Sequence, residues 1–211
     1  MTAFTRLGKG GRIDRSRTLA FTYDGQRLFG HAGDTLASAL LANGRLLVGR
    51  SFKYHRPRGF MSAGVEEANG LFTVGEGNRA EPNIAGTMVP LEEGLVARSQ
   101  NAWPSPAFDL MAVNSLAAPL FGAGFYYKTF MGPFKKSWMF YEPFIRKAAG
   151  MGKADSAKDG ARHDVEYSFC DVLVVGAGPA GLTAALAAGR AGAKVLVAEQ
   201  AGPSAGEGGE L

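Results

Sequence analysis

The 211-residue sequence predicts an α/β fold in two parts, a β-grasp sheet in front and a parallel βαβ unit behind. Two alternating strand patterns meet at Asp24-Gly25 and lead into a helix pattern, which is the order expected of a β-grasp domain. Further along, an apolar strand pattern runs into a glycine-rich turn at Gly176 and then an Ala/Leu-rich helix pattern. A second apolar strand pattern, KVLVAE, follows that helix and completes the βαβ order.

The front of the chain begins with a predicted hairpin. The stretch TLAFTYDGQRLFGH alternates on both sides of its Asp-Gly pair, which is a strong signal for a two-residue turn. The next stretch, DTLASALLANG, predicts a helix with Asp34 as N-cap and Asn43-Gly44 as its stop. We expect this helix to bury an apolar stripe made of Leu36, Ala39 and Leu40.

Later strands of the same sheet are expected from the stretches GLFTVG and GTMVPL. With them the front resembles a plant-type ferredoxin, in which the segment after the helix is a cysteine-rich loop that holds an iron–sulfur cluster. Here the corresponding loop has no cysteine. We therefore predict a ferredoxin-like β-grasp domain without cluster cysteines over residues 1–96, and no iron–sulfur cluster.

In place of cysteines this loop carries basic and aromatic side chains. They are Arg50, Phe52, Lys53, Tyr54, His55, Arg56 and Arg58. Basic and aromatic residues together can bind nucleic acid or a phosphate. A solvated loop that packs against a partner domain is the simpler interpretation, and no repeat or RNA-binding motif accompanies the loop. We therefore expect no nucleic-acid partner, and the net charge of +4 does not alter this.

Residues 97–164 are expected to form an aromatic-rich interface segment and a linker. From Ala97 to Gly150 the sequence is dense in aromatic residues and prolines and has little periodicity. Apolar surface on irregular chain seldom stays exposed on a monomer, so we expect another domain or subunit to bury it. The stretch from Gly150 to Asp164 is polar and typical of a linker.

The motif with the clearest chemistry is the GxGxxG that starts at Gly176. Its strand, DVLVV, is an apolar run typical of a strand buried on both faces. Gly176 would permit the tight strand-to-helix turn, Gly178 would leave room for a pyrophosphate, and Gly181 would let the helix pack close to the sheet. The helix that begins near Pro179 would direct its N–H groups at the phosphate, and Gly192 is its expected stop.

An acid stands where a dinucleotide site needs one. Glu199 follows Gly181 by 18 residues, close to the roughly 20 expected for an acid that binds a ribose 2′-hydroxyl. An acid rather than an arginine favours NAD over NADP, and FAD is the alternative because flavoproteins use the same glycine pattern. The residues after Gln200 show no strand pattern, so we expect an incomplete FAD/NAD(P)-binding Rossmann domain over residues 165–211, in the front piece of a longer polypeptide.

The composition excludes several other classes of protein. One cysteine, Cys170, excludes a disulfide framework and a Cys-based zinc site. The histidines, His31, His55 and His163, have no ligand spacing, so no metal site is expected. The basic N-terminus lacks an apolar signal core, and no apolar run approaches the ~18 residues of a membrane span. We therefore expect a cytoplasmic location and no membrane partner.

Several stretches together resemble the N-terminal part of the α (large) subunit of heterotetrameric sarcosine oxidase. They are RSFKYHRPRG, EPN, ARSQNAWPSPAFDLMAVN, GFYYKTFM, YEPFIRKAAG and DVLVVGAGPAGLTAAL. They cover nearly the whole chain, and the middle ones are specific because no generic fold demands them. Some relatives of this family keep the cluster cysteines, and this sequence departs from them.

The resemblance implies an oxidoreductase subunit that acts in an oxidative demethylation. Sarcosine, water and oxygen give glycine, hydrogen peroxide and formaldehyde, and the last passes to tetrahydrofolate when it is present. The resemblance also implies NAD in this chain, without a role as hydride acceptor, and FAD and covalently attached FMN in a partner β subunit. The implied partners are the β, γ and δ subunits and a small-molecule amine.

Four residues of this chain carry over from the family as nucleotide contacts, namely Gly176, Gly178, Gly181 and Glu199. No catalytic residue carries over, because the later part of the family's α subunit is not in this sequence, and we expect these 211 residues alone to be inactive. Two alternatives remain open at this point. One is a subunit of a related amine or amino-acid dehydrogenase, similar to hydrogen cyanide synthase, and the other is a non-catalytic interaction module.

Overall fold

A computed structural model describes residues 6–11, 13–120, 122, 124, 137–152 and 165–199 of the chain. The chain divides into two compact units, Met1–Asp159 and Gly160–Leu211. Most of the predicted linker and the tail after Glu199 lie outside the described residues, as does most of the GFYYKTFM stretch. The division into 1–96, 97–164 and 165–211 therefore stays a prediction.

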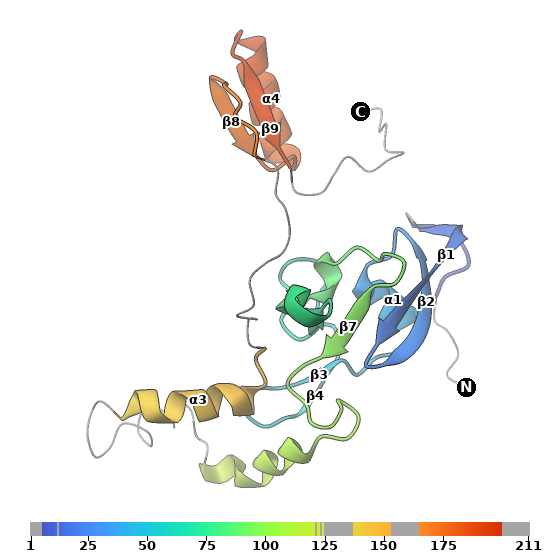
Figure 1. Cartoon of the computed structure of the whole chain (residues 1–211), viewed down its shortest axis with the longest axis vertical. Helices are drawn as coiled ribbons and strands as arrows, with labels where there is room; N and C mark the ends of the chain where they lie inside the picture. Colours follow the sequence, from blue (N-terminus) through green and yellow to red (C-terminus); the bar gives the residue numbers. More distant parts are fainter. Residues whose placement is uncertain are drawn as a thin grey trace. The chain divides into compact units, whose positions relative to one another are not determined.

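The first unit contains a five-stranded mixed sheet with the order β2-β1-β7-β5-β6 (Figure 1). β1 pairs antiparallel with β2 and parallel with β7, and β5 pairs antiparallel with both β7 and β6. The strands are β1 (Asp14–Tyr23), β2 (Gln26–Ala32), β5 (Leu71–Val74), β6 (Glu81–Ala85) and β7 (Val96–Ser99). A separate short pair, β3 (Gly49–Arg50) and β4 (Pro57–Arg58), frames the basic loop.

The hairpin between β1 and β2 turns at Asp24 and Gly25, as predicted. Both residues have positive φ angles, 47° and 76°. Positive φ at both central residues is what a type I′ turn requires, and Asp-Gly supplies it at low cost. The Asp24 carboxylate also accepts the Ser99 N–H at 2.7 Å, so the turn is tied to the end of β7.

Helix α1 (Leu36–Ala42) follows the hairpin, and its N-cap is Thr35 rather than the predicted Asp34. The Thr35 hydroxyl accepts the Ser38 N–H, and the Ser38 hydroxyl accepts the Thr35 N–H in return. Asp34 lies one residue earlier, where its carboxylate accepts the Ser38 hydroxyl and pairs with Arg6 at 2.7 Å. The predicted stop at Asn43-Gly44 is confirmed, with Asn43 as C-cap.

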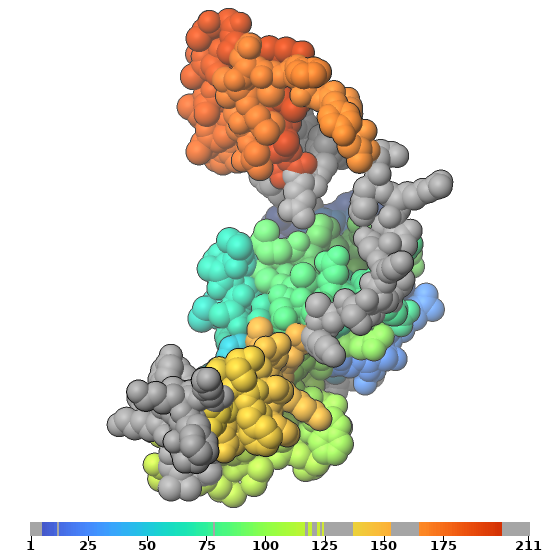
Figure 2. Space-filling model, turned by 60° about the vertical axis from the view of Figure 1, so that its left-hand side comes forward, coloured from blue at the N-terminus to red at the C-terminus, as the bar shows by residue number. Residues whose placement is uncertain are grey.

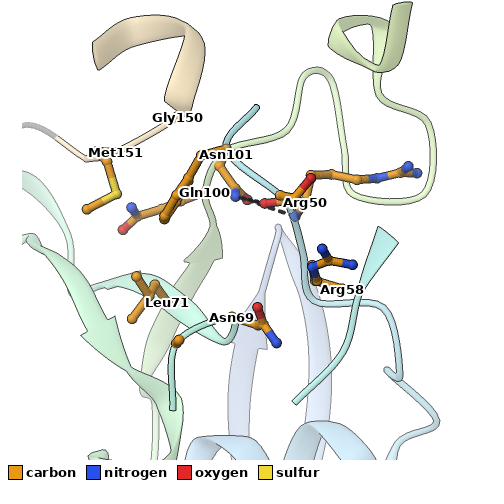
Figure 3. Close-up of a pocket in the computed structure, with 11 residues that line it drawn as sticks. Arg50, Arg58, Asn69, Leu71, Gln100, Asn101, Gly150 and Met151 are labelled. Atoms are coloured by element: carbon orange, nitrogen blue, oxygen red, sulfur yellow. Dashed lines mark hydrogen bonds between the residues drawn. The ribbon is translucent and has the colours of Figure 1, made fainter. Parts of the chain in front are cut away.

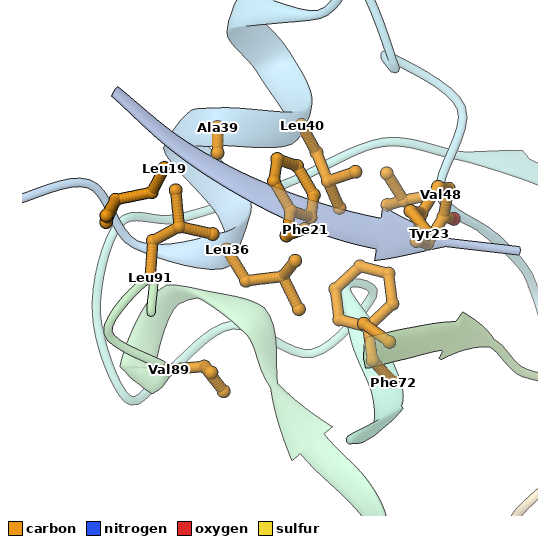
Figure 4. Close-up of a cluster of buried hydrophobic side chains, with 11 residues drawn as sticks. Leu19, Phe21, Tyr23, Leu36, Ala39, Leu40, Val48, Phe72, Val89 and Leu91 are labelled. Atoms are coloured by element: carbon orange, nitrogen blue, oxygen red, sulfur yellow. The ribbon is translucent and has the colours of Figure 1, made fainter. Parts of the chain in front are cut away.

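The hydrophobic core of the first unit joins β1, α1 and β5. The ring of Phe72 packs edge-on against Tyr23 with centroids 5.8 Å apart, and Figure 4 shows these side chains meeting those of α1. The predicted stripe of Leu36, Ala39 and Leu40 is fully buried. The whole cluster consists of Leu19, Phe21, Tyr23, Leu36, Ala39, Leu40, Val48, Phe72, Val89, Leu91 and Ala97.

One of the two later strands expected from the sequence does not form. GLFTVG contains β5, but GTMVPL forms the 3-10 helix η2 (Gly86–Met88) instead of a strand. A Cβ on Gly86 would lie 2.5 Å from the Phe72 ring, so the backbone here lies directly against a core side chain. The sheet instead gains β6, before the 3-10 helix, and β7, after it. Another 3-10 turn, η1 (Gly77–Arg79), precedes β6.

The aromatic segment is more regular than its sequence suggested. It contains the 3-10 helix η3 (Leu110–Leu120) and helix α3 (Trp138–Ala149), which ends at Gly150 with φ 69°. Figure 2 shows α3, in yellow, alongside the yellow-green segment that includes η3. A groove of about 520 Å³ between them is lined by Trp103, Met111, Phe144 and Lys147. Burial of this surface by a partner stays a prediction.

The second unit is a βαβ unit of β8 (Val172–Val175), α4 (Pro179–Arg190) and β9 (Val195–Ala198). The strands pair in parallel, and Gly192, with φ 92°, follows the helix as expected. The prediction of strands buried on both faces is wrong for the described residues. Leu173 and Val175 are 56% and 81% exposed, because α4 packs on the opposite face, beside Val174.

Candidate dinucleotide-binding site

The glycine-rich turn between β8 and α4 is built by Gly176 and Gly181. Gly176 has φ 98°, a conformation that other residues rarely adopt, and its N–H donates to the Ala198 carbonyl at 2.8 Å. A Cβ on Gly181 would lie 2.1 Å from the Gly176 carbonyl oxygen and 3.3 Å from a Val174 methyl group. Only glycine therefore fits at Gly181 without displacing the turn.

Gly178 differs from these two glycines because it faces open space. A Cβ built there meets no atom within 4 Å, and its backbone is extended. The absence of a side chain at Gly178 is thus not needed for packing within the described residues. It leaves the backbone open to a ligand, which is the role that the sequence pattern predicts.

The N-terminus of α4 lies next to this open position. Gly178 is the N-cap, Pro179 is the first residue of the helix, and no side chain caps the first turn. Because the first N–H groups of a helix lack partners within the helix and carry a partial positive charge, this end can accept an anion. Pro179 has no N–H group, but an N–H at the first helical position has no partner within the helix, so no helical hydrogen bond is lost.

Glu199 comes to the same turn from the end of β9. Its carboxylate accepts the Ala177 N–H, so the acid contacts the glycine loop across the two parallel strands. The four residues predicted as nucleotide contacts thus gather around one turn. Sequence reasoning missed the contact with Ala177, because a ribose-binding acid is recognised by its distance from the glycines and not by a partner in the loop.

Two residues of the basic loop, Arg50 and His55, hold it against the aromatic segment. His55 is buried, with Nδ1 2.6 Å from the Asp109 carboxylate and Nε2 2.9 Å from the Ala148 carbonyl oxygen. The Arg50 guanidinium donates to the carbonyl oxygens of Pro106 and His55. These contacts join the loop to the aromatic segment. The pairing of His55 with Asp109 was not predicted from the sequence.

The other basic residues of the loop lie further out. Lys53 and Arg56 flank the Tyr54 ring, with their cationic groups 4.9 Å and 4.8 Å from its centroid.

Among the residues that the structure describes, no three His, Cys, Asp or Glu side chains gather where a metal ion could bind. His163 lies outside those residues. In the same parts of the chain, no helix has the length and apolar character needed to cross a membrane.

Two protein families match the chain. A family described as a 2Fe-2S iron–sulfur cluster binding domain matches residues 16–102, and a family described as an FAD binding domain matches residues 171–208. The first match includes the five-stranded sheet, except for the first two residues of β1, and the basic loop. The second includes the whole βαβ unit. A mixed α/β fold with a ferredoxin-like domain followed by an FAD-binding domain is therefore shown.

The matches correct the predicted cofactors. The prediction of no iron–sulfur cluster is contradicted, because the front of the chain matches a family that is defined by such a cluster. Cys170 is the one cysteine of the sequence and lies outside the matched residues, so the matched segment has no thiolate to ligate iron. For the βαβ unit, the match supports FAD, the alternative to the predicted NAD.

Curated relatives carry one name. The chain is 60% identical over 195 residues to the sarcosine oxidase subunit alpha of Rhizobium meliloti, a match that covers 92% of this chain and 20% of that protein. Proteins of the same name from two Corynebacterium strains are 37% and 35% identical over 93% and 92% of this chain, and the match covers 16% of each. The chain thus spans about a fifth of the length of these relatives or less.

A solved structure titled as L-proline dehydrogenase from P. horikoshii also matches, with 18% identity and a TM-score of 0.41. The match covers 87% of this chain and 25% of that one. At this TM-score the likeness does not establish a common fold. The curated relatives are more informative: over 92% of its length, the chain is similar to the N-terminal part of the sarcosine oxidase subunit alpha of Rhizobium meliloti.

Proposed function

We propose that this chain is the dinucleotide-binding front part of the alpha subunit of a flavoenzyme that oxidatively demethylates sarcosine. The reaction would convert sarcosine, water and oxygen to glycine, formaldehyde and hydrogen peroxide, or to methylenetetrahydrofolate in place of formaldehyde when tetrahydrofolate is present. The observation that supports this proposal most is the 60% identity to a sarcosine oxidase subunit alpha over nearly the whole chain. The match of the βαβ unit to an FAD binding domain agrees with it.

In that reaction this chain would bind the dinucleotide and contact the other subunits of the enzyme. No residue here is assigned a catalytic role, and the other subunits of the enzyme are the proposed partners. The front domain (residues 1–96), the interface segment with its linker (97–164) and the start of the dinucleotide-binding domain (165–211) are the proposed divisions. The exposed side chains of Phe140 and Phe144 on α3 support an interface in the middle segment.

The turn around Gly178 would hold the diphosphate of an adenine dinucleotide. Gly176 shapes the turn, Gly178 leaves its approach open, and the first turn of α4 directs N–H groups at the negative charge. Glu199 would accept a ribose hydroxyl, and its contact with the Ala177 N–H keeps the carboxylate at the turn. A carboxylate has several lone pairs, so it can accept hydrogen bonds from more than one donor.

The residues present fit FAD, the ligand of the matched family. When bound, FAD would act as a two-electron carrier. The contacts proposed here all concern its ADP half, which leaves the identity of the other half to be measured. Release of the ligand by denaturation, followed by chromatography and absorbance in the flavin range, identifies it.

The test uses three glycine variants in the complete enzyme with all of its subunits. Gly178→Val should retain the fold, because a Cβ there meets no atom, but lose the dinucleotide because the side chain occupies its approach. Gly181→Val should disturb the βαβ unit itself, because of its 2.1 Å approach to the Gly176 carbonyl. Gly189→Ala, in open space later in α4, is the control and should behave as wild type.

The measurements are dinucleotide content per enzyme, circular dichroism and peroxide release from sarcosine. A Gly178→Val enzyme that keeps its full complement of dinucleotide would contradict the assigned site. An assembled wild-type enzyme that releases no peroxide from sarcosine would contradict the proposed reaction while leaving the site intact. The two proposals can therefore fail separately.

A further inference from the structure

A cavity of about 160 Å³ lies beside the basic loop in the first unit (Figure 3). Its walls come from the β3–β4 loop, the start of β5, the end of β7 and the residues that follow α3. This is the loop that, in a ferredoxin, would hold the cluster. The residues that matter for its chemistry are Arg50, Ser51, Arg58, Asn69, Leu71 and Met151.

Part of the polar lining is already engaged and forms the frame of the cavity. The Arg50 guanidinium donates to the Pro106 carbonyl at 2.8 Å and to the His55 carbonyl at 3.1 Å. The Asn101 side chain pairs with the backbone of Arg50, whose N–H donates to its oxygen at 3.0 Å. Arg50 and Asn101 therefore hold the wall in place and are not available to a ligand.

Arg58 and Asn69 are not engaged in this way. The Arg58 guanidinium makes a long hydrogen bond, 3.4 Å, to the carbonyl oxygen of its neighbour Pro57. The side-chain amide of Asn69 makes no hydrogen bond to any other described residue. The Ser51 hydroxyl accepts the Arg56 N–H at 3.0 Å, which leaves its own O–H able to donate. The cavity thus offers a guanidinium, an amide and a hydroxyl as donors.

The opposite side of the cavity is mainly apolar. Leu71 and Met151 lie across from Arg58 in Figure 3. Gln100 lies beside them, but its amide is already bonded to Thr73 and Asn83. A phosphate carries close to two negative charges and needs polar contacts on every side, whereas this cavity has a single cation with no strong partner and an apolar half. One negative charge with a short apolar tail matches both halves.

We propose that this cavity binds a small monocarboxylate. The Arg58 guanidinium holds the carboxylate, because its planar fork matches the two oxygens. Asn69 and Ser51 donate further hydrogen bonds to the same oxygens, and a short aliphatic tail lies against Leu71 and Met151. The site belongs to the first unit, so it is independent of the dinucleotide site in the second.

The test is a titration of the full-length protein with propionate, followed by the backbone amide signals of residues 69–71 and 100–101 in NMR spectra. Propionate should shift these signals in a saturable way. Arg58→Gln should weaken binding by about tenfold or more, because it removes a charge-assisted contact. Asn69→Ala, which keeps the charge, should weaken binding by a smaller factor. The spectra also report whether each variant is folded, and Asn69→Ala decides the matter if Arg58→Gln is not.

Arg56→Gln is the matched control, because Arg56 carries the same charge in the same loop but lies outside the cavity lining. It should bind propionate as wild type does. Equal weakening by Arg56→Gln and Arg58→Gln would mean that only the general charge of the loop matters, and it would overturn the site. Tighter binding of inorganic phosphate than of propionate would contradict the proposal that the ligand is a monocarboxylate. The absence of any saturable shift with propionate would contradict it as well.

Discussion

Glu67 lies in the irregular loop between β4 and β5, and its carboxylate accepts four backbone N–H groups. Those of Met61, Ser62 and Asn69 donate at 2.7 Å each and that of Gly70 at 2.9 Å. Burial alone would raise the pKa of Glu67, but these four donors outweigh it and hold the pKa below its ordinary value of 4.5. One side chain thus supplies the hydrogen bonds that a strand or helix would otherwise give this loop.

We predict that Glu67→Gln lowers the free energy of unfolding by about 2–3 kcal/mol, because the amide NH₂ would face two backbone donors. The adjacent Glu66→Gln removes the same charge from an exposed side chain and should change it by less than about 0.5 kcal/mol. Urea denaturation of both variants measures the difference. Equal effects of the two substitutions would show that charge, and not the four hydrogen bonds, is responsible.

The same carboxylate predicts a pH dependence, together with Asp34. Burial would raise the pKa of Asp34, yet the Arg6 guanidinium and the Ser38 hydroxyl hold it below the ordinary 3.8. A carboxyl group whose pKa is lower in the folded state stabilises the fold above its unfolded pKa and loses that contribution as pH falls through the folded pKa. The free energy of unfolding should therefore fall below about pH 4, and less steeply in Glu67→Gln, as denaturation at several pH values would test.

The roles of some residues could be predicted from the sequence and those of others could not, for a physical reason. Gly176, Gly178 and Gly181 were predictable because phosphate binding fixes their spacing within one turn. Glu67 was not, since nothing local distinguishes it from Glu66. The His55–Asp109 pair joins residues 54 positions apart, so it exists only once the chain has folded.

Among the elements, α1 is the one whose end depends on a specific reciprocal contact. The Thr35 and Ser38 side chains each accept the other's backbone N–H, at 3.2 Å and 3.0 Å. The helix buries Leu36 and Leu40 in the main core, so its register affects the whole first unit. Its first turn contains no acidic residue, which leaves the cap as the main local signal for where the helix begins.

We predict that Thr35→Ala costs about 1 kcal/mol of unfolding free energy, the usual cost of losing such a cap. Thr35→Ser keeps the hydroxyl and should cost clearly less. Thermal or urea denaturation distinguishes the two, with helix content followed by circular dichroism. Indistinguishable stabilities for the two variants would show that the methyl group of Thr35, and not its hydroxyl, matters.

The elements also show where sequence patterns fail. The hairpin was predictable because Asp24-Gly25 is a local turn signal, whereas GTMVPL has strand-forming residues but is diverted by the approach of Gly86 to Phe72. Helix α3 was missed because Pro143 and four aromatic residues hide its pattern. The signal that was available lies at its end, where Arg146 and Lys147 precede Gly150.

At the scale of the molecule, burial is concentrated in one of the two units. The main core cluster lies within residues 19–97, and α4 contributes no buried residue. On the β8–β9 sheet, the face that α4 does not cover carries Leu173 and Val175, more than half exposed, and Leu196, 40% exposed. A two-stranded sheet with one apolar face open to water has little to stabilise it by itself.

We predict that in the 211-residue chain the βαβ unit opens more readily than the β-grasp domain, because it lacks a buried core. Hydrogen exchange followed by mass spectrometry should find protected amides in β1, α1 and β7, and fast exchange over residues 171–199. Phe21→Ala removes a ring that is 1% exposed and should lower the unfolding free energy of the β-grasp domain by about 3–5 kcal/mol. Exchange in that domain should become faster, while exchange in the βαβ unit should not change. Leu173→Ala, on the open face, should change neither unit much. A βαβ unit that exchanges as slowly as β1 would refute this order of stability, since it would require a stabilising surface that the described residues do not provide.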